Sequence, residues 1–192
     1  MLLSHIKICD IVTKRAKVLD LGCGNGDLMY LLEQKKQANT QGVEILEDAI
    51  YKCVEKGLCV MHSDIDGALD FYKDDTFDFV ILSQSLQQVT RTAEVLKQCL
   101  RIGKKVIVAF PNFAHITVRS KLFFGGRAPV TKALPYGWDD TPNIRCLSIK
   151  DFEIFCKQKG YKVEEKYFIT NSRYCYILPN LFAQQAIFVI SK

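Results

Sequence analysis

The stretch Asp20-Leu21-Gly22-Cys23-Gly24-Asn25-Gly26 decides the fold of this chain. It closes the apolar run 17–21, which is typical of a buried strand, and precedes residues 27–34, where leucines recur at helical spacing. Glycine adopts the positive φ that a tight turn needs, and without a Cβ it lets a ligand lie against bare backbone. Amide groups at the start of the following helix would face that ligand. The stretch therefore predicts a strand, a ligand-binding turn and a helix.

Similar units continue along the chain. Strands are expected at residues 41–45, 59–62, 77–82 and 105–110, with helices at residues 47–56 and 92–101. Strands that alternate with helices form βαβ units, whose strands are parallel and whose crossovers are right-handed. A further helix at 148–159 and strand patterns at 161–168 and 186–191 follow. We therefore expect an α/β fold: a doubly wound, mostly parallel, Rossmann-like sheet with an antiparallel edge strand.

The length of 192 residues suits a single domain, because domains commonly contain about 100–200 residues. We expect residues 1–192 to form one cofactor-binding domain. Residues 111–147 interrupt the alternation after the fifth strand, and their Pro, Gly and aromatic residues suggest a loop with one short helix. Long irregular segments of compact domains are usually lids or binding surfaces. This insertion is therefore expected to cover a cleft or to bind a partner.

The composition argues against several classes of partner. The chain has 26 Lys and Arg against 21 Asp and Glu, and because the basic residues are scattered, no nucleic-acid partner is expected. No apolar run approaches the roughly 18–20 residues of a membrane span, and the N-terminus lacks a secretory signal. The eight cysteines form no CxxC pair, so we expect free thiols and no metal site. These features favour a cytoplasmic protein that does not bind membranes.

Two acidic residues follow the next two strands. Glu44 ends the second strand, 18 residues after Gly26, where a carboxylate can accept both hydroxyls of a ribose. Asp64 follows the third strand, where a carboxylate can accept an adenine amino group, although it can also be an ordinary turn residue. Dinucleotide sites prefer GxGxxG to the GxGxG found here, so a nicotinamide dehydrogenase is the rival interpretation.

A strand-end Asp, GxGxG, and an acid after each of the next two strands resemble class I S-adenosylmethionine-dependent methyltransferases. The resemblance implies S-adenosylmethionine as the cofactor. It assigns the methionine portion to Asp20, Gly22, Gly24 and Gly26, the ribose to Glu44, the adenine to Asp64 and Ile65, and the neighbourhood of the sulfonium to Ser83. Ile45, directly after Glu44, is included in the same cofactor site.

The catalytic residues stay unassigned. Residues 83–89, Ser-Gln-Ser-Leu-Gln-Gln-Val, follow the fourth strand and contain hydroxyls and amides but no carboxylate or histidine. Alignment accelerates an in-line methyl displacement, whereas an acceptor with an acidic proton also needs a base. His115 is a candidate base, but a packing or surface role is the simpler interpretation, and His62 is read as a strand-end residue. Methyl transfer and its acceptor therefore stay open.

The insertion narrows the resemblance to one family. The chain resembles methionine biosynthesis protein MetW in Gly42-Val43-Glu44, Ser63-Asp64-Ile65-Asp66, Leu82-Ser83-Gln84-Ser85-Leu86-Gln87, Phe110-Pro111-Asn112-Phe113, Gly125-Gly126-Arg127, Pro129-Val130-Thr131 and the run from Leu134-Pro135-Tyr136 through Asp140-Thr141-Pro142-Asn143-Ile144. The resemblance implies homoserine O-acyltransferase as a partner. The family usually carries a histidine after Thr-Pro-Asn-Ile, whereas this chain has Arg145.

We hypothesise an S-adenosylmethionine-binding, MetW-like protein of methionine biosynthesis that activates or stabilises homoserine O-acyltransferase. A cofactor derived from methionine could then report the output of the pathway to an early enzyme. The alternative is a catalytic S-adenosylmethionine-dependent methyltransferase that acts on a small molecule or a protein.

Overall fold

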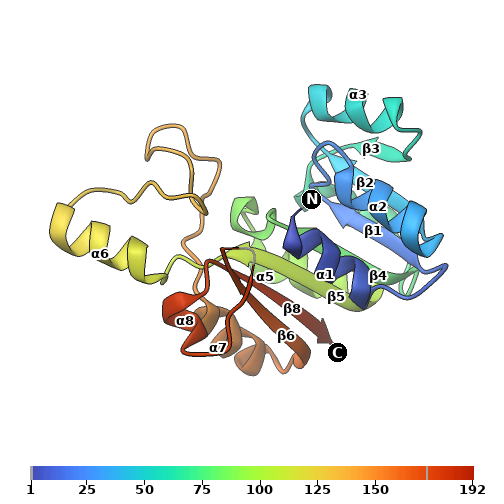
Figure 1. The fold of residues 1–192 in the computed structure, drawn as a ribbon. Helices are drawn as coiled ribbons and strands as arrows, with labels where there is room; N and C mark the ends of the chain where they lie inside the picture. Colours follow the sequence, from blue (N-terminus) through green and yellow to red (C-terminus); the bar gives the residue numbers. More distant parts are fainter. Residues whose placement is uncertain (1, 172) are drawn as a thin grey trace.

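The strands of the computed structural model, which describes residues 2–171 and 173–192, lie close to the expected positions. They are β1 (Lys17–Leu21), β2 (Asn39–Glu44), β3 (Val60–His62), β4 (Phe77–Ser83), β5 (Gly103–Pro111), β6 (Lys162–Thr170), β7 (Arg173–Tyr174) and β8 (Gln185–Ser191). They form one sheet in the order β3-β2-β1-β4-β5-β8-β6-β7 (Figure 1). The pairs from β3 to β5 are parallel. The expected antiparallel edge is also present, because β8 lies between β5 and β6 and runs antiparallel to both.

Helices connect the strands as the βαβ pattern predicts. They are α1 (Leu3–Ile11), α2 (Asp27–Lys36), α3 (Glu47–Glu55), α4 (Ile65–Ala68), α5 (Thr92–Ile102), α6 (Ile116–Gly125), α7 (Ile149–Lys159) and α8 (Pro179–Phe182), with 3₁₀ turns η1 (Leu69–Phe71) and η2 (Leu86–Gln88). α1 has no counterpart among the predicted elements. Its buried positions include Ser4 beside Ile8 and Cys9, so a polar residue interrupts the apolar pattern that would have indicated a helix.

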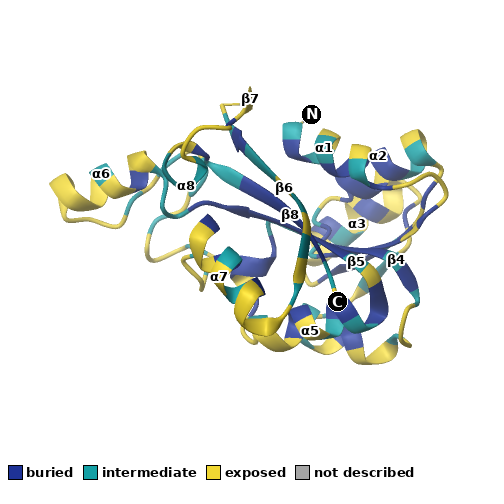
Figure 2. Ribbon diagram, turned by 90° about the horizontal axis from the view of Figure 1, so that it is seen from below, coloured by how far each residue is buried: buried dark blue, intermediate teal, exposed yellow. Residues whose placement is uncertain are grey.

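Helices cover both faces of the sheet (Figures 1 and 2). Along β4, Phe79 and Ile81 join the apolar cluster under α1 and α2, whereas Val80 and Leu82 join the cluster under α5 and α7. Because successive strand residues point to opposite faces, a sheet covered on both sides needs a continuous apolar run. This explains the continuous apolar runs 79–82 in β4 and 106–110 in β5. The fold class expected from the sequence is therefore confirmed.

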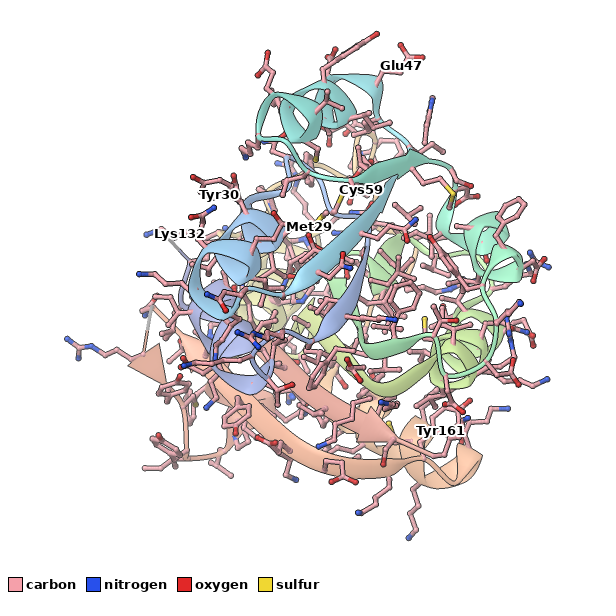
Figure 3. The ribbon with its side chains drawn as sticks, turned by 90° about the vertical axis from the view of Figure 1, so that its right-hand side faces the viewer. Met29, Tyr30, Glu47, Cys59, Lys132 and Tyr161 are labelled. Carbon is pink, nitrogen blue, oxygen red and sulfur yellow. The ribbon has the colours of Figure 1, made fainter. Side chains whose placement is uncertain are left out.

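The two sides of α2 illustrate how the helices pack. Met29 is fully buried and points toward the sheet, whereas its neighbour Tyr30 points away and is half exposed (Figure 3). Gly26 is the N-cap of α2, so the same buried face that fixes α2 on the sheet also fixes the position of the glycine-rich turn.

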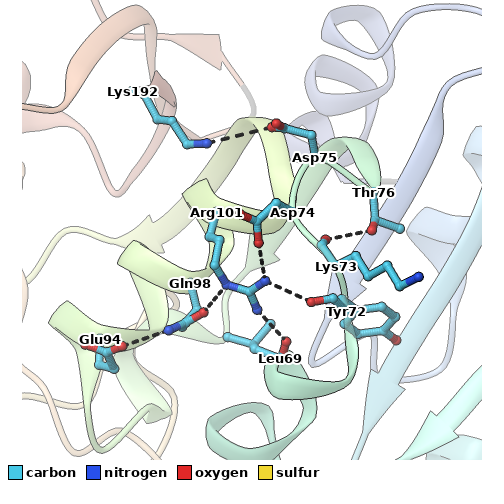
Figure 4. Close-up of polar contacts among 10 residues, drawn as sticks. All are labelled: Leu69, Tyr72, Lys73, Asp74, Asp75, Thr76, Glu94, Gln98, Arg101 and Lys192. Carbon is cyan, nitrogen blue, oxygen red and sulfur yellow. Dashed lines mark hydrogen bonds and ion pairs between the residues drawn. The ribbon is translucent and has the colours of Figure 1, made fainter.

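At the opposite end of the sheet, Arg101 holds the connection that leads into β4 (Figure 4). Its guanidinium donates to the carbonyl oxygens of Leu69 (3.1 Å) and Tyr72 (2.9 Å) and pairs with Asp74 at 2.7 Å. One fork of donors thus ties the C-terminal end of α5 to the η1 region.

The insertion between β5 and α7 differs from the rest of the fold. It consists of α6 and an irregular segment, as the sequence predicts, and it projects from the body of the molecule (Figure 1). Val118 is the buried residue of α6, whereas Phe123 and Phe124 are each 83% exposed. Figure 2 shows that most of α6 is exposed. The insertion therefore presents apolar side chains to solvent.

Candidate functional site

A cavity of about 510 Å³ lies where β1, β2, β3 and β4 end. β1 pairs with β2 on one side and with β4 on the other, so the order of strands reverses at this point. Ligands of open α/β sheets bind at such a switch point, outside the carboxyl ends of the strands. We call this cavity the cleft. The predicted site residues that line it are Gly22, Gly24, Glu44, Ile45, Asp64, Ile65 and Ser83.

The glycine-rich turn supplies one wall of the cleft. The amides of Gly22 and Cys23 both donate to the carbonyl oxygen of Val43, at 2.8 and 3.1 Å. Gly22 has a φ of +73°, and a Cβ there would lie 2.8 Å from the Cβ of Ser85. Gly24 has a φ of +54°, and apart from Gly24 and its two chain neighbours no described residue has an atom within 4 Å of the position its Cβ would take. Gly22 is therefore required for packing, whereas Gly24 leaves bare backbone open.

Glu44, at the end of β2, holds the turn in place. Its Oε2 accepts the Gly24 amide at 2.8 Å, and its Oε1 accepts the amides of Ile45 (2.8 Å) and Leu46 (3.0 Å). A carboxylate offers about four acceptor positions, so roughly one remains, on Oε2. Sequence reasoning assigned both hydroxyls of a ribose to this carboxylate. In this conformation it can accept one, and a second would have to displace a backbone amide.

Asp20 lies beneath the turn and does not line the cleft. It is buried, and its Oδ1 has no hydrogen-bond partner among the residues described. Burial, followed by the nearby charge of Glu44, raises the pKa of Asp20 to about 7. Burying a carboxylate without a partner is unfavourable. A ligand that brings a cation or an N–H donor to this position would relieve that cost.

Asp64 has a local role as well as a place on the cleft wall. It is the N-cap of α4, and its Oδ1 accepts the amide of Asp66 at 3.4 Å. The two interpretations of Asp64 that the sequence left open are thus compatible, because a capping carboxylate still has a free oxygen. Ser83, the last residue of β4, lies on the opposite side of β1 from Glu44 in the strand order.

Gly26 faces away from the cleft. A Cβ on Gly26 would lie 2.5 Å from Cδ1 of Leu58 and 2.9 Å from Sγ of Cys53. Its place in the motif therefore reflects the packing of α3 against the turn.

The candidate histidines do not line the cleft. Nδ1 of His115 accepts the amide of Thr117 at 3.2 Å and caps α6, and burial lowers its pKa. His62 lies at the end of β3, with its Nε2 3.1 Å from the carbonyl oxygen of Ile45. Within the described ranges, no group of His, Cys, Asp and Glu has the arrangement of a metal site.

Sequence reasoning missed several cleft residues between β4 and α5. Gln84, Ser85 and Thr90 line the cleft. Ser85 donates through Oγ to the carbonyl oxygen of Leu21 at 2.6 Å, which joins β1 to the segment after β4. Gln84 has a φ of +63°, and its buried Nε2 finds no acceptor in the described part of the chain. The run of polar residues directly after the apolar strand β4 was the sequence feature that could have identified them as cleft residues.

The insertion contains a second cavity, of about 440 Å³. Its lining includes Leu122, Tyr136, Trp138 and Arg145. We call this the insertion pocket. Trp138 is 81% exposed at its rim.

None of the described helices has the length and apolar character that a membrane-spanning segment needs.

Solved structures share this architecture. An S-adenosylmethionine-dependent methyltransferase from Archaeoglobus fulgidus, at 18% identity and a TM-score of 0.72, covers 99% of this chain and 93% of its own. A second one, from Mesorhizobium loti, has 13% identity and a TM-score of 0.71, and the match covers 99% of this chain and 98% of that one. At these identities the likeness establishes the fold alone, which is the methyltransferase-like fold expected from the sequence.

Sequence relatives identify the family. The bifunctional methionine biosynthesis protein MetXA/MetW of Rhodopirellula baltica is 32% identical over 170 residues, which cover 84% of this chain. The match spans 27% of the length of that relative. The family model for methionine biosynthesis protein MetW matches residues 3–190. Because that match extends over nearly the whole sequence, the chain belongs to the MetW family.

Proposed function

We propose that this protein binds S-adenosylmethionine in the cleft and acts with homoserine O-acyltransferase in methionine biosynthesis. The observation that carries the first part is that seven of the nine residues assigned to the cofactor line one cavity at the switch point of the sheet. The volume of about 510 Å³ lies within the range of roughly 300–1,000 Å³ that is usual for small-molecule sites.

The chemistry of the donor set fits the cofactor. The ammonium group of its methionine portion would bring a positive charge close to the carboxylate of Asp20, which is buried beneath the wall of the cleft. The remaining acceptor position of Glu44 would bind a ribose hydroxyl beside the bare backbone of Gly24. Asp64 and Ile65 would hold the adenine, and Ser83 would lie near the sulfonium. The cofactor carries a methyl group that can be transferred by in-line displacement.

Substitutions at two glycines test the proposed cofactor site. Gly24 and Gly57 both have positive φ, and apart from their chain neighbours no described residue has an atom within 4 Å of either would-be Cβ, but only Gly24 lines the cleft. Replacing either by Ala should cost about 1–2 kcal/mol in the free energy of unfolding. Equilibrium dialysis with S-adenosylmethionine should then give an affinity about tenfold weaker for Gly24→Ala and unchanged for Gly57→Ala. Equal affinities for the two variants would reject the site.

The partnership rests on the relative whose name joins MetXA to MetW and on the surface of the insertion. Residues 111–147 carry five basic and two acidic side chains together with exposed aromatic residues. Aromatic side chains and arginine are the types that anchor interfaces. We propose that this segment binds the acyltransferase. Co-purification of the two proteins, repeated with cofactor present, should yield a complex, and its absence under all conditions would reject the partnership.

A catalytic methyltransferase is the second candidate, favoured by the same intact cleft. The polar segment 83–89 provides no carboxylate or histidine, so an acceptor that must lose a proton would have to find its base elsewhere. Formation of S-adenosylhomocysteine in a cell extract, abolished by Glu44→Ala, would establish turnover. A purified, cofactor-loaded protein that forms none would favour a binding role.

A further inference from the structure

The peptide of Thr90 connects the cleft to the insertion. Its N–H donates to Oδ2 of Asp66 at 3.3 Å, and its carbonyl oxygen accepts Nη2 of Arg145 at 2.6 Å. Asp66 and Thr90 both line the cleft, next to the residues assigned to the adenine. One residue of the cleft wall is therefore bonded to the proposed cofactor site on one side and to the insertion on the other.

The end of the insertion is fastened to the same wall at a second point. The amides of Ile144 and Arg145 both donate to the carbonyl oxygen of Gln87, each at 3.0 Å. Pro142, two residues earlier, lines the cleft itself. We call residues 142–145 the strap. The three hydrogen bonds that Ile144 and Arg145 donate end on the carbonyl oxygens of Gln87 and Thr90, so movement of that turn would move the strap.

The segment to which the strap is hydrogen-bonded, residues 84–90, contains buried polar groups without hydrogen-bond partners among the described residues. The buried Nε2 of Gln84 and Oε1 of Gln87 have no partners among the described residues, although one is a donor and the other an acceptor. Gln84 also holds a left-handed backbone conformation that is uncommon outside glycine. Such a segment can gain hydrogen bonds by rearranging, and a ligand in the cleft would contact it directly, because Gln84 lines the cleft.

On its other side, Arg145 belongs to the insertion pocket, where it lines the same cavity as Tyr136 and Trp138. We infer that Arg145 is a positioning residue that couples ligand occupancy of the cleft to the aromatic surface of the insertion. This inference rests on the proposed function and adds a route by which the cofactor would regulate partner binding. Coupling of this kind is reciprocal, so partner binding would alter cofactor affinity by the same factor.

The single tryptophan of the chain provides a direct test, because Trp138 lines the insertion pocket and is absent from the cleft lining. S-adenosylhomocysteine, which has no methyl group to transfer, is titrated into the full chain while Trp138 fluorescence is recorded. Calorimetry on the same samples measures binding. In the wild type, the emission should change and saturate with the affinity found by calorimetry.

Arg145→Gln removes the guanidinium fork, and Arg127→Gln is the control, since Arg127 lies in the same insertion and makes no bond to the 87–90 turn in the described structure. Arg145 is exposed, so the fold should survive. The emission change should fall at least about threefold in Arg145→Gln, with an affinity within about threefold of wild type, and Arg127→Gln should behave as wild type. Arg145→Lys, which keeps the positive charge and can still donate to a carbonyl oxygen, should restore part of the change.

The outcomes separate the two proposals. A wild-type protein that shows no binding heat rejects the proposed cofactor site. Binding without any change in Trp138 emission, or an unchanged response in Arg145→Gln, rejects the coupling and leaves the cofactor site standing.

Discussion

The glycine-rich turn and the insertion differ in how firmly they are held and in which side chains they expose to solvent. Amides of the turn donate to the carbonyl oxygen of Val43 and to the carboxylate of Glu44, both at the end of β2, and the carboxyl group of Asp20 beneath the turn is buried. The insertion exposes Phe123 and Phe124 almost completely and is fastened to the body through its strap. A rigid, polar turn suits a small ligand that must be held in one geometry. An exposed aromatic surface suits a large partner that can cover it.

The largest effect is expected where the turn meets the sheet. Gly22→Ala combines a left-handed backbone with a Cβ placed 2.8 Å from Ser85. The free energy of unfolding should fall by about 4 kcal/mol, the sum of a conformational cost and an overpacking cost. Gly24→Ala, with open space at its Cβ, should lose about 1–2 kcal/mol. Urea unfolding compares the two, and equal losses would mean that the turn is not packed against the segment after β4.

The second effect is a pH dependence that comes from Asp20. In the native protein this carboxyl keeps its proton up to about pH 7, whereas its ordinary pKa is 3.8. The unfolded chain therefore binds fewer protons across this window. The contribution of Asp20 to the free energy of unfolding is fully present below pH 3.8 and is lost as the pH rises to about 7.

Asp20→Asn removes this loss. Without ligand, the variant should be more stable than wild type at about pH 8 by something on the order of 4 kcal/mol, and the difference should shrink toward about pH 4. Urea unfolding at several pH values measures it. A constant difference at all pH values would show that Asp20 has an ordinary pKa in the native state.

The smallest effect on stability is expected in the insertion. The rings of Phe123 and Phe124 pack against each other and are otherwise exposed. Replacing both by Ser should change the free energy of unfolding by less than about 0.5 kcal/mol. The same change should weaken binding of the acyltransferase by about tenfold or more, as loss of aromatic anchors does. A large loss of stability with an unchanged complex would reverse the contrast between the two regions.

Local patterns were enough to predict most of the fold. The apolar runs of β1, β4 and β5 and the glycine-rich turn are continuous in sequence, so their structure follows from neighbouring residues. Helix α1 was not predicted, because the polar residue Ser4 occupies one of its buried positions. The bond of Arg145 to Thr90 joins residues 55 positions apart, and no periodicity encodes such a contact.

The candidate site was predictable to a similar degree. Strand ends converge at one edge of a parallel sheet, so Glu44, Asp64 and Ser83 could be grouped before their geometry was known. The packing role of Gly26 could not be predicted, because glycine occurs both where bare backbone binds a ligand and where the backbone closely contacts a neighbouring helix. The hydrogen bonds between the Glu44 carboxylate and backbone amides could not be predicted either, since they depend on the rotamer of that side chain.

The other proposals depend on S-adenosylmethionine binding in the cleft above Asp20. Isothermal titration of the full chain with S-adenosylmethionine at about pH 8 tests it, with Asp20→Asn beside Asp139→Asn, an exposed carboxylate of the insertion. We expect one saturable site in the wild type and in Asp139→Asn, and an affinity at least about tenfold weaker in Asp20→Asn. No binding in the wild type, or equal affinities in all three proteins, would contradict it.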